Sequence, residues 1–316
     1  MGKIVCLHGF TPEQQEEVRR LAPGWSLTFG RTGEIDPACY REAEIICGWN
    51  ADAARECLES GAALRWVQTW SAGVDKLPLQ DFGSRGVLVT NASGVHPEPM
   101  SETVLAMMLG LTRGLHRSIR AQAGAAWEKT GSLPEMHGKT AAVIGAGAIG
   151  REVAFLAKAF GMRMIGVRRS GRSAPGFDRV VTEDRLDDIL PESDYVINIL
   201  PLTAETRHLF DEGRFRLMKP TSYFINVGRG ATVKTEALVS VLQSGGIAGA
   251  GLDVFEEEPL PAGHPLWKLD NIILTPHNAG ATEHYKERVV ALFLDNLRRY
   301  LAGEQLRNLV GYSQGY

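Results

Sequence analysis

A glycine-rich turn near the middle of the chain has the residue types that hold a pyrophosphate. It reads GAGAIG at residues 145–150, after an apolar run and before apolar residues at helical spacing. Gly145 would allow the tight turn, Gly147 a close backbone approach, and Gly150 the packing of helix on strand. An ordinary glycine-rich turn is the alternative, but the strand and helix context favours dinucleotide binding at the helix amides. The predicted contacts are Gly145, Gly147, Ala148, Ile149 and Gly150.

The next predicted strand ends on basic residues where NAD-binding folds of this type carry an acid. Arg168 lies 18 residues after Gly150, within RRSGR at residues 168–172. A carboxylate there would bind the adenosine ribose hydroxyls, whereas a guanidinium can pair with a 2′-phosphate. A solvated basic loop is the alternative. We predict NADP(H) rather than NAD(H), with contacts from Arg168, Arg169, Ser170 and Arg172.

The elements that must position these residues follow a repeating pattern. Short apolar runs alternate with helical patterns, which is typical of βαβ units and parallel sheets. The predicted strands are residues 3–7, 44–47, 66–69, 87–90, 141–145, 164–167, 195–200, 223–227, 247–254 and 271–275. The predicted helices are residues 12–21, 51–60, 101–115 and 283–301, and one after the glycine turn with apolar positions 149, 153, 156 and 160.

The domain boundaries are predicted from composition. Residues 91–101 are rich in Pro, Gly and Ser, and Pro97 and Pro99 argue against a continuous helix there. We therefore predict an α/β protein with two doubly wound parallel-sheet domains. Residues 1–97 and 284–316 form a flavodoxin-like substrate domain, and a Rossmann nucleotide domain, residues 98–283, is inserted in it.

Composition excludes several classes of function. The 316 residues carry a net charge of −3, which gives no electrostatic reason to expect nucleic acid or an anionic membrane as partner. The longest apolar block, residues 104–111, is shorter than the ~20 residues of a membrane span, and no signal peptide precedes it. The four cysteines form no CxxC pair. We expect a cytoplasmic protein without metal or disulfides.

Five motifs between residues 138 and 281 resemble the D-isomer-specific 2-hydroxyacid dehydrogenases. They are GAGAIGREVA, NILPLTAETRHLF, FINVGRGATV, AGAGLDVFEEEPLP and HPLWKLDNIILTPHNAG. The first 135 residues match more loosely, through WSAGVDKL and NASGVHPEPMSE. Within the family, the glyoxylate and hydroxypyruvate reductases are most similar.

The resemblance implies a catalytic trio of Arg229, Glu258 and His277. As hydride reaches the keto carbon, a protonated His277 would donate to the carbonyl oxygen as general acid. Glu258 would orient the ring and favour its protonated form, and Arg229 would clamp the substrate carboxylate. Each residue type is commonly structural by itself, so the inference depends on the motifs. Among the three acids 256–258, only the resemblance selects the one before Pro259.

Further contacts are also implied by the resemblance. For the cofactor they are Leu200, Pro201, Leu202, Thr206, Val227, Gly228, Asp253, Ala279 and Gly280, with Asp253 near the nicotinamide carboxamide. For the substrate they are the backbone amides of Ser71, Ala72, Gly73 and Val74, and the side chain of Trp49, for which a core or surface position is the alternative. The remaining histidines are predicted to be structural: His8, His96, His116, His137, His208, His264 and His284.

Three functions stay open at this point. The leading hypothesis is an NADPH-dependent reductase of glyoxylate, hydroxypyruvate or a similar 2-keto acid. It would act as a homodimer that uses the helix 101–115. The second is an NAD-dependent dehydrogenase of a larger D-2-hydroxy acid, including 3-phosphoglycerate, although no C-terminal regulatory domain is expected after Tyr316. Formate is disfavoured, because Glu258 stands where formate dehydrogenases carry Gln. The third is a dinucleotide-sensing corepressor-type binding protein.

Overall fold

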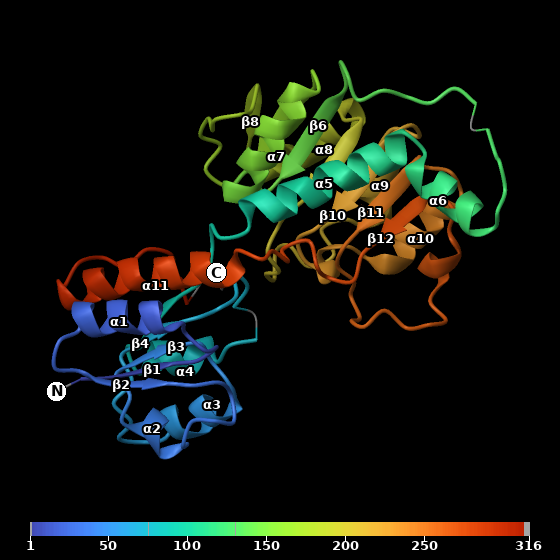
Figure 1. Cartoon of the computed structure of the whole chain (residues 1–316). Coiled ribbons are helices and arrows are strands. Elements are labelled where there is room, and N and C mark those ends of the chain that lie inside the picture. The colour runs from blue at the N-terminus through green and yellow to red at the C-terminus, as the bar shows by residue number, and fades with distance from the viewer. Residues whose placement is uncertain (1, 75, 130, 313–316) are drawn as a thin grey trace. The chain divides into compact units, whose positions relative to one another are not determined.

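The chain folds into two compact units in a computed structural model that describes residues 2–74, 76–129 and 131–312. The first unit combines Met1–Val95 with Glu283–Tyr316, and the second is His96–Thr282 (Figure 1). These boundaries lie one or two residues from those predicted. No helix in the described ranges is both long and apolar enough to cross a membrane.

The first unit contains a five-stranded parallel sheet in the order β2-β1-β3-β4-β5, the flavodoxin-like arrangement. Its strands are β1 (Lys3–Cys6), β2 (Ser26–Phe29), β3 (Ile45–Cys47), β4 (Trp66–Gln68) and β5 (Leu88–Thr90). Its helices are α1 (Pro12–Leu21), α2 (Ala38–Arg41), α3 (Ala51–Cys57), α4 (Leu79–Ser84) and α11 (Tyr285–Leu301). The sequence did not predict β2, because SLTF is a short edge strand without a fully buried residue.

Alternate residues of these strands form two apolar layers. On one face Val5 and Val67 pack with Tyr40 and Phe82 from the helices α2 and α4. On the other face the sheet packs against α1 and α11, as Figure 1 shows, and the Phe293 ring stacks on Trp66 with 5.5 Å between ring centroids. The final helix is therefore part of the first unit.

The second unit contains a seven-stranded parallel sheet in the order β12-β11-β10-β9-β6-β7-β8. Its strands are β6 (Thr140–Ile144), β7 (Arg163–Val167), β8 (Arg179–Val181), β9 (Tyr195–Asn198), β10 (Tyr223–Asn226), β11 (Gly249–Leu252) and β12 (Ile272–Leu274). Its α-helices are α5 (Pro97–Thr112), α6 (Leu115–Ala123), α7 (Ala148–Ala159), α8 (Leu186–Ile189), α9 (Glu212–Leu217) and α10 (Thr235–Gln243). Short 3₁₀ helices are η1 (Glu183–Arg185), η2 (Leu190–Glu192), η3 (Gly230–Thr232) and η4 (Pro265–Lys268).

Helices cover both faces of this sheet. Residues of α5 and α7 pack on one face with Ala141 and Val143, and residues of α8, α9 and α10 pack on the other with Ala142 and Ile144. The strand order reverses between β6 and β9, and in doubly wound sheets ligands bind beyond the carboxyl ends of the strands at such a point. The predicted fold class, two doubly wound parallel-sheet domains, is confirmed.

Three local predictions are wrong. The helix predicted from residue 101 begins at Pro97, because Pro97 and Pro99 lie in its first turn, where proline removes no helical hydrogen bond. It ends at Thr112, and Gly114, at φ +65°, precedes the separate helix α6. The buried residues of α7 are Gly150, Val153, Ala154 and Ala157, whereas Phe160, expected on the apolar face, is exposed.

Candidate active site

The glycine turn adopts the geometry that its three glycines predict. Gly145 has φ +108°, and its amide donates to the Val167 carbonyl at 3.0 Å. A Cβ on Gly150 would lie 2.5 Å from the Gly145 carbonyl oxygen, so the helix approaches as closely as glycine permits. A Cβ on Gly147 would meet no described atom within 4 Å. The turn therefore leaves open space beside the first turn of α7, where the amides of Ala148, Ile149 and Gly150 lack intrahelical acceptors.

The basic residues after β7 lie on one loop. The Arg168 amide donates to the Val181 carbonyl at 3.1 Å, which ties the start of this loop to β8. The Arg168 side chain is partly buried and forms no ion pair with a described residue, whereas Arg169 lies 3.9 Å from Glu183. Ser170 and Arg172 are exposed. The described residues 168–172 that follow β7 include no carboxylate that would compete with an anionic ligand.

The loops after β9 and β10 are in close contact. A Cβ on Gly228 would lie 2.6 Å from the Leu200 carbonyl oxygen, so only glycine fits at this position. The Thr206 hydroxyl donates to the Pro201 carbonyl at 2.7 Å and so closes the loop that also contains Leu202. Leu200 and Val227 are buried beneath these loops.

A buried polar network supports the turn that contains Arg229. The Asn198 amide group donates to Asn226 at 3.0 Å and to Thr232 at 2.7 Å, and Thr232 donates to the Arg229 carbonyl at 2.6 Å. The three side chains of this network are at most 1% exposed. Sequence reasoning missed them, although an Asn that ends each of two neighbouring strands was a usable signal.

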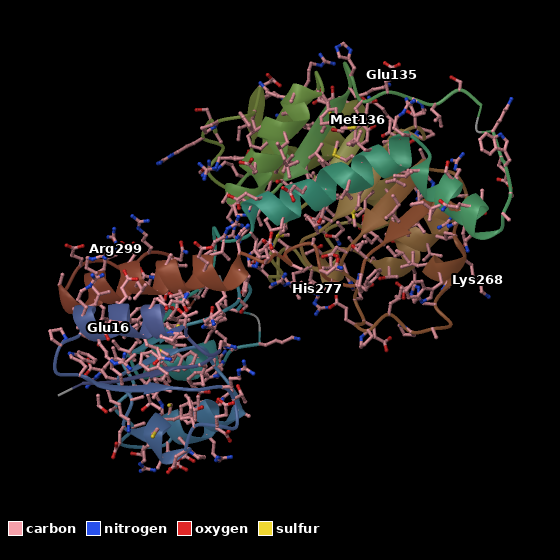
Figure 2. The ribbon with its side chains drawn as sticks, in the orientation of Figure 1. Glu16, Glu135, Met136, Lys268, His277 and Arg299 are labelled. Atoms are coloured by element: carbon pink, nitrogen blue, oxygen red, sulfur yellow. The ribbon has the colours of Figure 1, made fainter. Side chains whose placement is uncertain are left out.

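His277 and Glu258 form the central contact of the site. His277 Nδ1 lies 2.7 Å from Glu258 Oε2, and Glu258 Oε1 accepts the Phe255 amide at 3.0 Å. Burial would raise the pKa of Glu258, but the hydrogen bonds from His277 and Phe255 and the charges of His277 and Arg229 hold it below its ordinary value. His277 Nε2 has no partner among the described residues, and half of the side chain is exposed. Figure 2 labels His277 in the second unit. The carboxylate therefore fixes the ring with Nε2 available to a substrate.

Asp253 anchors the turn that presents His277. Its carboxylate accepts hydrogen bonds from the Thr275 hydroxyl at 2.6 Å and from the Asn278 and Ala279 amides at 2.9 Å each. Its carbonyl accepts the His277 amide at 2.8 Å, and His277 has φ +52°. Such a left-handed residue needs support from its surroundings. Sequence reasoning gave Asp253 only a cofactor contact and missed this role.

The next turn is closely packed at Gly280. A Cβ there would lie 2.8 Å from the His96 ring, and the neighbouring Ala279 is 2% exposed. The described part of the second unit thus brings Arg229, Glu258 and His277 together at the carboxyl edge of the sheet. It also places the predicted cofactor residues along that edge.

The predicted substrate residues of the first unit follow β3 and β4. The amides of Ala72, Gly73 and Val74 have no hydrogen-bond partner within residues 2–74 and the other described ranges. The loop is shaped instead through its carbonyls, since Ala72 accepts from the Asn91 side chain at 2.9 Å and Gly73 from the Ser71 hydroxyl at 2.6 Å. Free amides of this kind can hold a carboxylate. Trp49 is partly buried and packs edge-on against Phe82, 5.0 Å between ring centroids.

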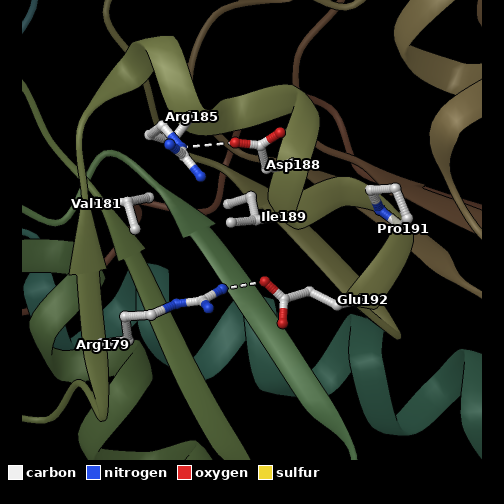
Figure 3. Close-up of a pocket in the computed structure, with 7 residues that line it drawn as sticks. All are labelled: Arg179, Val181, Arg185, Asp188, Ile189, Pro191 and Glu192. Atoms are coloured by element: carbon white, nitrogen blue, oxygen red, sulfur yellow. Dashed lines mark hydrogen bonds and ion pairs between the residues drawn. The ribbon is translucent and has the colours of Figure 1, made fainter.

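A separate surface pocket of about 390 Å³ lies beside β8 and α8 (Figure 3). None of the predicted site residues line it. Its two arginines are paired with carboxylates, Arg179 with Glu192 and Arg185 with Asp188. The described residues contain no group of three or more His, Cys, Asp or Glu arranged to hold a metal ion.

Comparison with known proteins places these features in context. The family model of the D-isomer specific 2-hydroxyacid dehydrogenase NAD-binding domain matches residues 105–279. The glyoxylate reductase of Pyrococcus horikoshii is 37% identical over 258 residues, 79% of this chain and 77% of that protein.

Two solved structures are similar over nearly the whole chain. A D-isomer specific 2-hydroxyacid dehydrogenase from Xanthobacter autotrophicus Py2, in complex with NADPH and MES, has a TM-score of 0.83 and 30% identity, and the match covers 100% of this chain and 99% of that one. An NADPH-dependent glyoxylate/hydroxypyruvate reductase from Sinorhizobium meliloti, in complex with NADP and sulfate, has a TM-score of 0.81 and 26% identity, with 100% of both chains covered.

Proposed function

Because the chain belongs to the D-isomer specific 2-hydroxyacid dehydrogenase family, we propose that it reduces glyoxylate, hydroxypyruvate or a similar small 2-keto acid with NADPH. The predicted family resemblance is confirmed. The chain is an oxidoreductase that transfers a hydride between a nicotinamide cofactor and a 2-keto or 2-hydroxy acid. The proposed residue roles rest above all on one observation, the 2.7 Å contact between His277 and Glu258.

The residues of the second unit fit a dinucleotide. The open space at Gly147 and the amides at the start of α7, which lack intrahelical acceptors, suit a pyrophosphate that lies against the helix end. When bound, the cofactor supplies or accepts the hydride. The contacts proposed for it are those predicted from the sequence, from Gly145 to Gly280.

The chain's own residues divide the remaining chemistry. His277 Nε2 donates a proton to the carbonyl oxygen during reduction and takes it back in the reverse direction. Glu258 stays ionised, since its pKa is held low, and stabilises the imidazolium at Nδ1. Arg229 pairs with the substrate carboxylate and polarises the carbonyl.

We assign the coenzyme preference to Arg168. A carboxylate at the end of β7 would repel a 2′-phosphate, whereas this guanidinium has no ionic partner among the described residues. Arg169, Ser170 and Arg172 follow on the same loop as further phosphate contacts. The NADPH and NADP in the two related structures agree with this preference.

We further propose that residues 71–74 and Trp49 bind the substrate in the first unit, that the chain is a homodimer, and that it is cytoplasmic. Free amides support the first assignment, and four unpaired cysteines suit a reducing compartment. The apolar residues of α5 are used in packing within the second unit. A dimer contact is therefore better sought at exposed Leu115 and Ile119 of α6 and at Trp127, which is 92% exposed.

The decisive experiment is a panel of 2-keto acids assayed with both coenzymes. We expect the highest kcat/KM for glyoxylate or hydroxypyruvate with NADPH. A higher value with NADH would contradict the Arg168 assignment, and turnover restricted to larger acids would contradict the substrate class. If no keto acid is reduced, the proposed function fails as a whole. Light scattering of the same preparation measures the oligomeric state, and cell fractionation tests the location.

A further inference from the structure

The segment that contains Glu258 has little backbone support of its own. Residues 255–260 lie in the connection between β11 and β12, outside any helix or strand, and among the described residues no backbone–backbone hydrogen bond involves them. The one hydrogen bond of the Phe255 amide within the described ranges goes to the Glu258 carboxylate. The location of the Glu258 carboxylate must therefore depend on side-chain contacts and on packing.

Glu256 supplies such contacts two residues earlier. Its Oε2 accepts the Thr235 amide at the start of α10 at 2.7 Å, and its Oε1 lies 2.6 Å from His208 Nε2. Burial would raise the pKa of Glu256, but hydrogen bonds from Thr235 and His208 hold it below its ordinary value. An ionised Glu256 thus joins the Glu258 segment to the start of α10 and to the loop that contains His208, both distant in the sequence.

His208 belongs to the loop after β9, which is itself attached to the turn after Arg229. The His208 amide donates to the Ala231 carbonyl at 2.8 Å, and the Phe210 amide donates to Thr232 at 3.0 Å. His208 adopts φ +52°, the left-handed region that a non-glycine residue rarely occupies without a specific contact. The backbone thus directs the imidazole to Glu256.

Gly230, next to Arg229, packs directly against the backbone of the segment that contains Glu258. A Cβ on Gly230 would lie 1.9 Å from the Phe255 carbonyl carbon and 2.6 Å from the Glu256 nitrogen. Backbone therefore touches backbone between the Arg229 turn and the Glu258 segment. Any shift of Glu256 would change the place of Glu258 relative to Arg229.

We infer that Glu256 and His208 are positioning residues that hold Glu258 against His277, an inference that rests on the proposed function. The glutamates of both His–Glu pairs lie in the short segment 256–258. In the proposed mechanism the His277–Glu258 pair meets the reacting atoms, whereas the His208–Glu256 pair does not. His208 was predicted to be structural, and this inference gives that role a specific form. The family resemblance selected Glu258 and gave Glu256 no role. In this inference Glu256 anchors the segment that carries Glu258.

The test compares Glu256→Ala, Glu256→Gln and His208→Ala with Glu257→Ala. Glu257 is exposed, and it makes no hydrogen bond or ion pair in the described part of the chain. Glu257→Ala therefore removes a neighbouring negative charge but keeps the contacts of Glu256. We expect Glu256→Ala and His208→Ala to lower kcat by about 10–100-fold, because misplacement by about 1 Å can cost that much. NADPH affinity should be unchanged.

The pH–rate profile separates positioning from simple destabilisation. When Glu258 is displaced from the imidazolium, the alkaline limb of kcat/KM for reduction should move to lower pH. Glu256→Gln keeps an acceptor for Thr235 and a polar group for His208, so it should restore most of kcat and of the wild-type limb. A thermal melt of each variant shows whether it is folded.

The outcomes are distinct. Lower kcat with a displaced limb in both alanine variants, and recovery in Glu256→Gln, supports the inference. The inference is overturned if Glu256→Ala has the same kcat and alkaline limb as Glu257→Ala. It is also overturned if Glu256→Ala loses thermal stability while its alkaline limb stays at the wild-type pH. If Glu256→Ala does not fold, His208→Ala alone decides by the same readout. Wild type and His277→Ala are assayed in parallel, since an inactive wild type would contradict the proposed function and not this inference.

Discussion

The two units present their functional groups in different ways. In the second unit the reactive groups are side chains, and each is held by further side chains: His277 by Glu258, its turn by Asp253, and the Arg229 turn by buried Thr232. In the first unit the groups offered are backbone amides of residues 72–74. Side-chain chemistry requires particular residue types, so it leaves motifs, whereas backbone chemistry requires only a loop shape. The same difference predicts how strongly each region responds to substitution.

The largest effect is expected at the proton donor. His277→Ala should lower kcat for reduction by about 10²–10⁴-fold, because the developing alkoxide loses its general acid. NADPH affinity, measured by fluorescence titration, should change little. An unchanged kcat would remove His277 from the acid–base role.

The next effect is expected at Arg229. Arg229→Met should raise KM for glyoxylate and lower kcat/KM by about 10–100-fold, since a charge-assisted contact to the carboxylate contributes about 1.5–3 kcal/mol. The Asn198, Asn226 and Thr232 network remains intact in this variant, so its thermal stability serves as the control. The assignment fails if steady-state kinetics show wild-type KM and kcat.

The coenzyme loop should respond selectively. Arg168→Asp should lower kcat/KM with NADPH by about tenfold or more and should spare NADH, because a carboxylate repels the 2′-phosphate and accepts ribose hydroxyls. Parallel assays with both coenzymes measure the ratio. The exposed neighbour Arg172 provides a matched charge control as Arg172→Asp, with a smaller expected change. An equal loss with both coenzymes would mean that Arg168 does not discriminate between them.

A substitution at Asp253 tests whether its carboxylate holds the turn that contains His277. Asp253→Asn puts an amide N–H₂ where one carboxylate oxygen accepts the Thr275 hydroxyl or a backbone amide, and should cost about 1–3 kcal/mol of unfolding free energy. Urea denaturation measures this loss, and kcat should fall with it. Wild-type stability would show that the carboxylate is not the anchor.

The smallest effect is expected in the first unit. Ser71→Ala removes the hydroxyl contact to the Gly73 carbonyl but leaves the amides in place. KM for glyoxylate should rise by no more than about tenfold, in line with the loss of one neutral hydrogen bond of about 1 kcal/mol. A loss as large as that of Arg229→Met would erase the contrast between the two units.

The sequence predicted the features that depend on local pattern. Strand ends and the glycine turn follow from apolar runs and from Gly145, Gly147 and Gly150, whose roles are local. The edge strands β2 and β8 were missed because they are short and without fully buried residues. The start of α5 was missed because a proline signals both a break and a first helical turn.

Supporting contacts between distant residues were beyond sequence reasoning. Asp253 meets Asn278 25 residues later, and His208 meets Glu256 48 residues later, so no spacing rule connects them. The choice of Glu258 among three acids needed the family resemblance, and the structure supplies the physical reason. Glu258 faces His277, whereas Glu256 faces His208.

The pH dependence of Glu258→Gln tests the central pair most directly. The folded pKa of Glu258 is lowered, so wild type should keep the carboxylate down to below its usual pKa of about 4.3 and lose it only in stronger acid. Removal of this charge should move the alkaline limb of kcat/KM for glyoxylate reduction to lower pH by about one unit, while Glu257→Gln leaves it in place. A limb at the same pH in wild type and Glu258→Gln would contradict the assignment of Glu258 and His277 as the acid–base couple.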